Sequence, residues 1–126
     1  MNKLQQLASP LARFLLGSIF LMAGLSKIGN YEGTAGYMEA MGVPGGLLPL
    51  VILVEALSGL LVIIGFKTRI NAFLLGGFSA LSGLLFHFDP SNQMEMTMLM
   101  KNFAIAGGML LLVINGGGHY SLDNRK

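Results

Sequence analysis

Four apolar stretches divide this 126-residue chain, and they limit its fold more than any other feature of the sequence. They run over residues 11–28, 47–66, 71–88 and 97–114. A helix needs about 20 mostly apolar residues to cross the hydrocarbon core of a bilayer, and at about 1.5 Å per residue each stretch would span about 27–30 Å. The sequence therefore predicts four transmembrane helices.

The composition agrees with a protein that faces lipid. Hydrophobic residues make up 53% of the chain and charged residues only 11%, whereas a soluble domain carries about 25% charged residues. Eight Lys and Arg with six Asp and Glu cannot cover a water-facing surface of this size. The high hydrophobicity also excludes a disordered chain. The dispersed cations do not form the basic run that would track nucleic-acid phosphates.

The breaks between the apolar stretches predict an all-α, up-down bundle of four transmembrane helices over residues 1–126. Pro44-Gly45-Gly46 precedes the second stretch, Lys67-Thr68-Arg69 separates the second from the third, and Asp89-Pro90-Ser91-Asn92 follows the third. Pro10 fits the first turn of the first helix. No A-x-A-like cleavage site follows that helix, so we expect it to be retained and not removed as a signal peptide.

Small residues occur in every predicted span, where they would let helices approach closely. They are Gly17, Gly24, Ser58, Gly59, Gly76, Gly77, Ala80, Gly83, Ala104, Gly107 and Gly108. Faces of this kind would also permit a homo-oligomer, although no symmetry can be deduced from the sequence.

The first connection, from Gly29 to Gly46, is too long for a tight turn. Thr34 is a candidate N-cap for a short helix over Ala35–Met41, which Gly42 and Pro44 would end. Such a helix would lie in the membrane interface with Tyr37 at the level of the headgroups. Two interpretations stay open: an ordered connector that covers the bundle, or a lid over a ligand pocket.

The distribution of cations predicts the orientation of the chain in a bacterial inner membrane. Six cations fall on the side of the termini, and Lys27 and Lys101 fall on the other side. By the positive-inside rule both termini are expected in the cytoplasm. We expect Arg13 to reach the cytoplasmic headgroups, the alternative being a role in a second, inner site. The tail segment from Tyr120 to Asp123 would pack on the inner mouth. The six cations are Lys3, Arg13, Lys67, Arg69, Arg125 and Lys126.

Ionisable residues inside the predicted spans mark a candidate site. Glu55 lies well inside the second span and Lys101 inside the fourth, while Lys27 and His87 end the first and third. An ionisable group in a membrane is costly unless it is partnered, so such residues are functional candidates. Because successive helices alternate in direction, all four residues would lie in one layer of the outer half of the bundle.

This polar layer permits a structural and a functional interpretation. In the first, Glu55 and Lys101 form a buried ion pair that fixes helix register, and Lys27 extends to the headgroups. In the second, the layer is a pocket for a small anionic or quinone-like ligand, or a proton relay. Glu55, Lys101 and His87 would then be the catalytic residues. The residues predicted to contact the quinone are Lys27, Asn102 and Tyr37.

The sequence gives little support for metals or thiol chemistry. The chain has no cysteine, which excludes disulfides, thiolate catalysis and thiolate-held metal clusters. His87 and His119 would lie on opposite sides of the bilayer and could not share a haem. Methionine thioethers suit Cu(I), but on a helix the alternating methionines would point in different directions. No metal site and no covalently bound cofactor are predicted. The methionines concerned are Met94, Met96, Met98 and Met100, with Met38 and Met41 in the first connection.

Taken together, these motifs and their order resemble the DoxX family of small bacterial inner-membrane proteins over nearly the whole chain. The matching segments are Arg13 to Gly17, Ala23-Gly24-Leu25-Ser26-Lys27, Glu55 to Gly59, Gly65-Phe66-Lys67-Thr68-Arg69, His87, Lys101-Asn102-Phe103-Ala104, Gly107-Gly108 and Tyr120-Ser121-Leu122-Asp123. The resemblance implies four transmembrane helices and a plasma-membrane location. The resemblance also links the chain to relatives that are described as a subunit of thiosulfate:quinone oxidoreductase and as a partner in membrane-associated thiol-redox complexes.

Three hypotheses on function follow. The first is a quinone-interacting or oxidoreductase-associated membrane subunit, in which the quinone or a redox partner protein carries the electrons. The second is a non-catalytic membrane scaffold or assembly factor. The third is a small-molecule or metal-ion permease. Whether the chain is itself an enzyme is left open by its residues.

Overall fold

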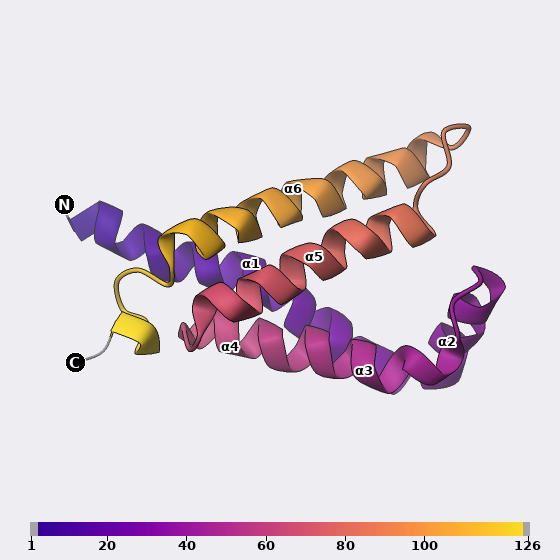
Figure 1. The fold of residues 1–126 in the computed structure, drawn as a ribbon, viewed down its shortest axis with the longest axis horizontal. Helices are drawn as coiled ribbons and strands as arrows, with labels where there is room; N and C mark the ends of the chain where they lie inside the picture. The colour runs from indigo at the N-terminus through magenta and orange to yellow at the C-terminus, as the bar shows by residue number, and fades with distance from the viewer. Residues whose placement is uncertain (1–2, 125–126) are drawn as a thin grey trace.

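The computed structural model describes residues 3–124, and within that range it contains helices and no strands (Figure 1). Four helical segments are long and apolar enough to cross a membrane, which confirms the predicted fold class. They are α1 (Lys3–Gly29), a composite second crossing (Gly45–Ile64), α5 (Thr68–Phe86) and α6 (Gln93–Asn115). Arg125 and Lys126, two of the cations used to predict orientation, lie outside the described residues.

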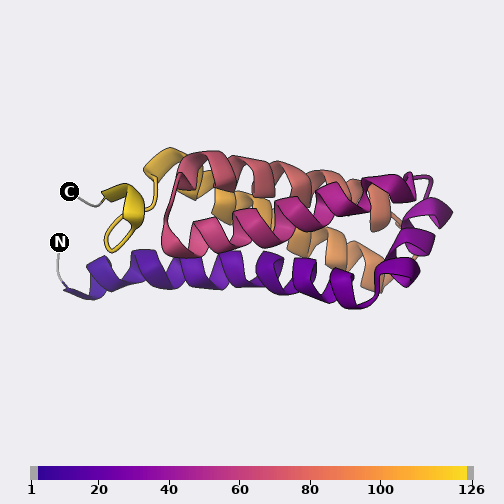
Figure 2. The ribbon, with the colours of Figure 1, turned by 90° about the horizontal axis from the view of Figure 1, so that it is seen from below.

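The four crossings run up and down, so the two ends of the bundle carry different parts of the chain (Figures 1 and 2). The tail end holds residues 3–10, the turn at residues 64–68 and the C-terminal segment 116–124 with its short helix η3 (Leu122–Asn124). The loop end holds the connections at residues 29–47 and 87–93, including α2 (Tyr31–Ala40). The predicted site residues are expected at the loop end.

The second crossing is built from four consecutive helical pieces. It consists of η1 (Gly45–Leu47), α3 (Leu48–Ile52), η2 (Leu53–Ser58) and α4 (Gly59–Ile64). The η2 segment is a π-helical turn and contains Glu55. Turns of this kind inside α-helices are rare and frequently lie at functional sites. Gly65, with φ of 76°, ends the crossing in the left-handed conformation that glycine adopts easily.

Close backbone packing joins α1 to the second crossing. A Cβ atom on Gly17 would lie 2.6 Å from the carbonyl oxygen of Gly59, and one on Gly24 would lie 2.8 Å from the backbone nitrogen of Ala56. No larger side chain fits at these positions without moving the helices apart. Small residues therefore set this interface, as predicted, whereas a Cβ atom on Gly77 or Gly107 would meet no atom within 4 Å.

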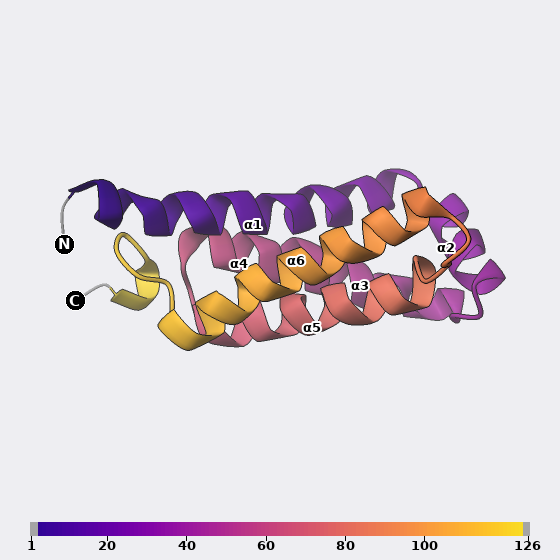
Figure 3. The same cartoon turned by 90° about the horizontal axis from the view of Figure 1, so that it is seen from above.

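The second helical pair, α5 and α6, packs beside the first (Figure 3). Residues from all four crossings meet in one apolar core that lies between the two pairs. The buried members of this core are Phe20, Val62, Ala72, Leu75, Met109 and Leu112.

Helix boundaries differ from the predicted ones because caps and polar flanking residues extend the helices beyond their apolar stretches. The first helix begins at Lys3 and contains Pro10 in its interior, so the prediction of Pro10 in a first turn was wrong. At the start of α6, the side chain of Asn92 accepts a hydrogen bond from the backbone of Glu95 and caps the helix before the apolar stretch begins.

The short helix of the first connection exists, but it begins earlier than predicted. It covers Tyr31–Ala40 instead of Ala35–Met41. Thr34 lies inside it, where its hydroxyl donates to the carbonyl oxygen of Asn30 (2.9 Å), so Thr34 is not the N-cap. The backbone of Gly42 has a φ of 83° just beyond the end of the helix.

Candidate functional site

Arg13 is part of a hydrogen-bonded cluster at the tail end of the bundle. Its side chain is 1% exposed, and its guanidinium donates to the carbonyl oxygens of Ile63 (2.7 Å), Tyr120 (2.9 Å) and His119 (3.1 Å). The carbonyl of Ile63 lies in the last turn of α4, where helical carbonyls lack partners within their own helix. The expectation that Arg13 reaches lipid headgroups was therefore wrong.

The C-terminal tail packs against the same end, as predicted. The carboxylate of Asp123 accepts hydrogen bonds from the backbone nitrogens of Lys67 (2.6 Å) and Thr68 (2.7 Å) at the start of α5. The nitrogen of Asp123 in turn donates to the carbonyl oxygen of Gly65 (2.8 Å). Partial burial raises the pKa of Asp123, but the hydrogen bonds from Thr68 and Lys67 and the charge of Arg13 outweigh burial, so the pKa lies below its ordinary value.

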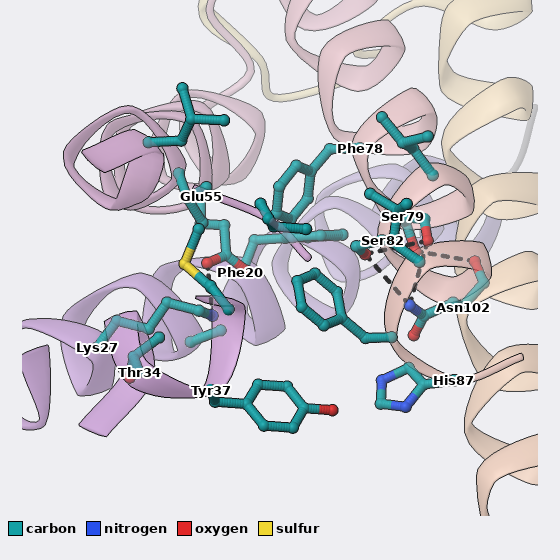
Figure 4. A pocket seen from close by; sticks show the side chains of 18 of the residues that line it. Phe20, Lys27, Thr34, Tyr37, Glu55, Phe78, Ser79, Ser82, His87 and Asn102 are labelled. Atoms are coloured by element: carbon teal, nitrogen blue, oxygen red, sulfur yellow. Dashed lines mark hydrogen bonds and ion pairs between the residues drawn. The ribbon is translucent and has the colours of Figure 1, made fainter. Parts of the chain in front are cut away.

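A cavity of about 510 Å³ lies within the bundle toward its loop end. All four crossings and α2 contribute to its wall, which is mostly apolar with a few polar groups (Figure 4). Cavities of this volume and composition are typical of small-molecule sites. The structure brings the six predicted site residues into this one wall: Lys27, Tyr37, Glu55, His87, Lys101 and Asn102.

Glu55 is paired with Lys27 in this wall. The ammonium of Lys27 lies 2.6 Å from Oε1 of Glu55, and the Glu55 residue is only 4% exposed. The expected Glu55–Lys101 pair is absent from the ion pairs among residues 3–124. The reason is the close contact of Gly24 with Ala56, which brings the last turns of α1 against η2. Lys27 therefore meets Glu55 instead of extending to the headgroups.

The opposite wall carries His87 and Asn102 (Figure 4). Nδ1 of His87 lies 2.9 Å from a carboxylate oxygen of Glu95, a partner that the sequence did not indicate. The amide of Asn102 donates to the carbonyl oxygen of Ser79 (3.1 Å), and the Ser79 hydroxyl donates to the Asn102 carbonyl oxygen (2.8 Å). Asn102 thus lines the cavity while its amide joins α6 to α5.

Aromatic side chains complete the wall. The ring of Tyr37 stacks on Phe86 with 5.5 Å between centroids, and this contact joins α2 to the end of α5. Phe20 and Phe78 also line the cavity. Sequence analysis missed these three phenylalanines, because an aromatic residue in an apolar span has the same signature whether it faces lipid, core or a cavity.

Among the described residues, no group of three or more His, Cys, Asp and Glu side chains could hold a metal ion. Met94 and Met100 are 75% and 69% exposed, whereas Met38 is buried in the wall of the cavity. His87 follows the last residue of α5, and His119 lies in the tail near the first residue of that helix. The two histidines are therefore at opposite ends of the bundle.

The fold and the site define a class: a polytopic membrane protein of four crossings with a largely apolar cavity between them that a few polar side chains line. The family model described as DoxX matches residues 9–88. Inner membrane protein YqjF of Escherichia coli is 48% identical over 123 residues, which cover 98% of this chain and 95% of that protein. The chain belongs to the DoxX family and is a multi-pass protein of the inner membrane.

Two further relatives extend this comparison. Inner membrane protein YphA of Escherichia coli is 34% identical over 122 residues, covering 91% of this chain and 87% of that protein. A Bacillus subtilis protein named "Putative oxidoreductase CatD" is 36% identical over 70 residues, covering 56% of this chain and 52% of that protein. No solved structure matches the chain.

Proposed function

We propose that this protein binds a quinone in the cavity toward the loop end and serves as the membrane subunit of an oxidoreductase. The observation that carries the proposal is the Lys27–Glu55 ion pair in the wall of a largely apolar cavity of about 510 Å³. An ionisable pair inside a membrane bundle indicates a substrate or proton pathway. The name of the Bacillus subtilis relative, an oxidoreductase, supports the same class of function.

The chemistry of the two walls suits a quinone head group. Lys27 and Glu55 lie on one side of the cavity and His87 on the other (Figure 4), as the two carbonyl oxygens of a para-quinone lie on opposite sides of its ring. Aromatic side chains stack favourably on a flat ring, and Tyr37, Phe20 and Phe78 supply such surfaces. The apolar remainder of the wall suits an isoprenoid chain.

Each polar wall provides a group that exchanges protons. Lys27 donates a hydrogen bond to one quinone oxygen, and Glu55 lies next to it to take up or release a proton. On the other side Glu95 holds the Nδ1–H of His87, which leaves Nε2 to exchange a proton with the ligand. Reduction of a quinone to a quinol takes two electrons and two protons. The chain has no cysteine to carry the electrons, so a redox partner protein supplies them.

The proposed orientation places the loop end away from the cytoplasm. Among the described residues, Lys3, Lys67 and Arg69 lie toward the tail end and outside the core of the bundle, and the positive-inside rule assigns such cations to the cytoplasmic side. The quinone site would then exchange protons with the non-cytoplasmic side.

The test is a binding titration of a short-chain ubiquinone analogue to the purified protein in an uncharged detergent. Wild type is expected to bind, and Lys27→Met and Glu55→Gln are each expected to weaken binding about tenfold through loss of a hydrogen bond to a charged group. Lys3→Met at the far end of α1 is the matched control and should bind as wild type does. Equal affinity in all four proteins would overturn the proposal, as would failure of folded wild type to bind the analogue at all.

A further inference from the structure

The ionisable side chains that line the cavity do not balance in charge. Among the described residues of the wall, Lys27 and Lys101 are cationic, and Glu55 is the only carboxylate. Lys27 and Glu55 neutralise one another at 2.6 Å. The nearby carboxylate of Glu95 is paired with His87. Among residues 3–124, no carboxylate lies within 4.0 Å of the Lys101 ammonium.

The packing of α6 fixes which way Lys101 faces. Asn102, the next residue, is hydrogen-bonded to Ser79 of α5, so α6 cannot rotate about its axis without breaking these bonds. Ile105, one turn beyond Lys101, also lines the cavity. Lys101 is eight residues past the first residue of α6 but only four past the start of its apolar stretch, or about 6 Å along the helix axis. The residue is exposed and at the same time contributes to the wall of the cavity.

A lysine near the end of a span can extend to the headgroups, but Lys101 also lines the cavity, where no carboxylate pairs with it. We infer that the ligand supplies a partner, and that the quinone bound in this cavity is an acidic one, whose ring carries an ionised hydroxyl or carboxyl group that pairs with Lys101. This inference rests on the proposed function and narrows it, because a neutral quinone would leave Lys101 without a counter-ion.

A matched pair of ligands tests the inference. The probes are a 2-hydroxy-3-alkyl-1,4-naphthoquinone, whose vinylogous acid group is ionised at neutral pH, and its neutral 2-methoxy ether. Binding of each to purified wild type, Lys101→Gln, Lys101→Arg and Lys67→Gln is measured in an uncharged detergent. Lys67 is the control cation, at the tail end of the bundle.

Wild type is expected to prefer the hydroxy compound about tenfold, the size of one hydrogen bond to a charged group. Lys101→Gln should abolish this preference without changing the affinity for the methoxy ether, while Lys101→Arg and Lys67→Gln should retain it. An unchanged preference in Lys101→Gln would show that Lys101 extends to the headgroups and would overturn the inference. Binding of the methoxy ether tests the proposed function separately, because it does not need Lys101.

Discussion

Arg13 and Glu55 are both buried charged residues of the crossing helices, but their surroundings differ. Arg13, near the tail end, donates to three backbone carbonyls drawn from α4 and from the C-terminal tail. Glu55, nearer the loop end, is paired with one side chain, that of Lys27, and the pair lines a cavity.

We attribute a structural role to Arg13 and propose a functional one for Glu55 because of this difference. The two terminal nitrogens of the Arg13 guanidinium are occupied by partners that the chain itself supplies, so this cluster joins the first helix, the second crossing and the tail. The Lys27–Glu55 pair is made of two side chains next to space for a ligand, and either side chain can exchange its partner for that ligand. Mutations near the tail end should therefore change stability alone, and mutations of the polar residues around the cavity should change binding as well.

The largest expected effect on stability is that of Arg13→Met. The substitution leaves three partly buried carbonyls without their charged donor, and we expect it to lower the free energy of unfolding by about 3 kcal/mol. Chemical unfolding in mixed micelles measures this change. Quinone affinity of the protein that remains folded should match wild type. If Arg13→Met weakened quinone binding and left the free energy of unfolding unchanged, the tail end would be the binding region, which would contradict the account.

Next in size is the effect of Lys27→Met, which leaves the Glu55 carboxylate buried without its partner. We expect the free energy of unfolding to fall by about 2 kcal/mol. The double variant Lys27→Met with Glu55→Gln should recover part of this loss, because it leaves no carboxylate buried without its partner. The same unfolding assay gives the coupling between the two residues. Additive effects of the two single changes would show that the pair does not interact.

Asp123→Asn should have a smaller effect, about 1 kcal/mol, because it weakens the cap on the first turn of α5. The pKa of Asp123 is lowered in the folded protein, so its contribution is fully present above the ordinary carboxyl pKa of about 4. That contribution is lost as the pH falls through the lower folded value. The stability difference between wild type and Asp123→Asn should therefore be constant near neutral pH and vanish in strong acid. A difference that grows on acidification would contradict this cap.

The smallest expected effect is that of Tyr37→Ala, which removes the stack on Phe86 that joins α2 to α5. We expect a loss of about 0.5 kcal/mol in quinone affinity, while Tyr37→Phe keeps the stack and should bind as wild type does. Tighter binding in Tyr37→Ala would show that α2 restricts access to the cavity instead of forming its wall.

Hydropathy was sufficient to predict the four crossings, because membrane spans are set by length and composition. Alternation of helix direction was likewise sufficient to place Lys27, Glu55, His87 and Lys101 toward the same end. The partner of Glu55 could not be predicted, because the choice between Lys27 and Lys101 depends on how the helices are rotated about their axes. Contacts such as that of Gly24 with Ala56 set this rotation, and they join residues far apart in the sequence.

The role of Arg13 was unpredictable for a related reason. Its carbonyl partners belong to residues that are 50 or more positions away in the sequence. Because every residue has a backbone carbonyl, the residue types do not indicate which carbonyls will accept these hydrogen bonds. A lone arginine near a helix end gives the same sequence pattern whether its side chain contacts lipid headgroups or forms hydrogen bonds with distant segments of the chain.

The central claim is that the cavity toward the loop end holds the quinone, and photo-crosslinking tests it most directly. A quinone analogue with an azido group on its ring is irradiated with the purified protein, and the labelled peptides are identified by mass spectrometry with and without excess unlabelled quinone. The account predicts competed labelling of the cavity wall, in residues 78–86 of α5, in His87 and in α2. Labelling confined to residues 110–114 of α6, toward the tail end, or labelling that excess quinone does not suppress, would contradict it.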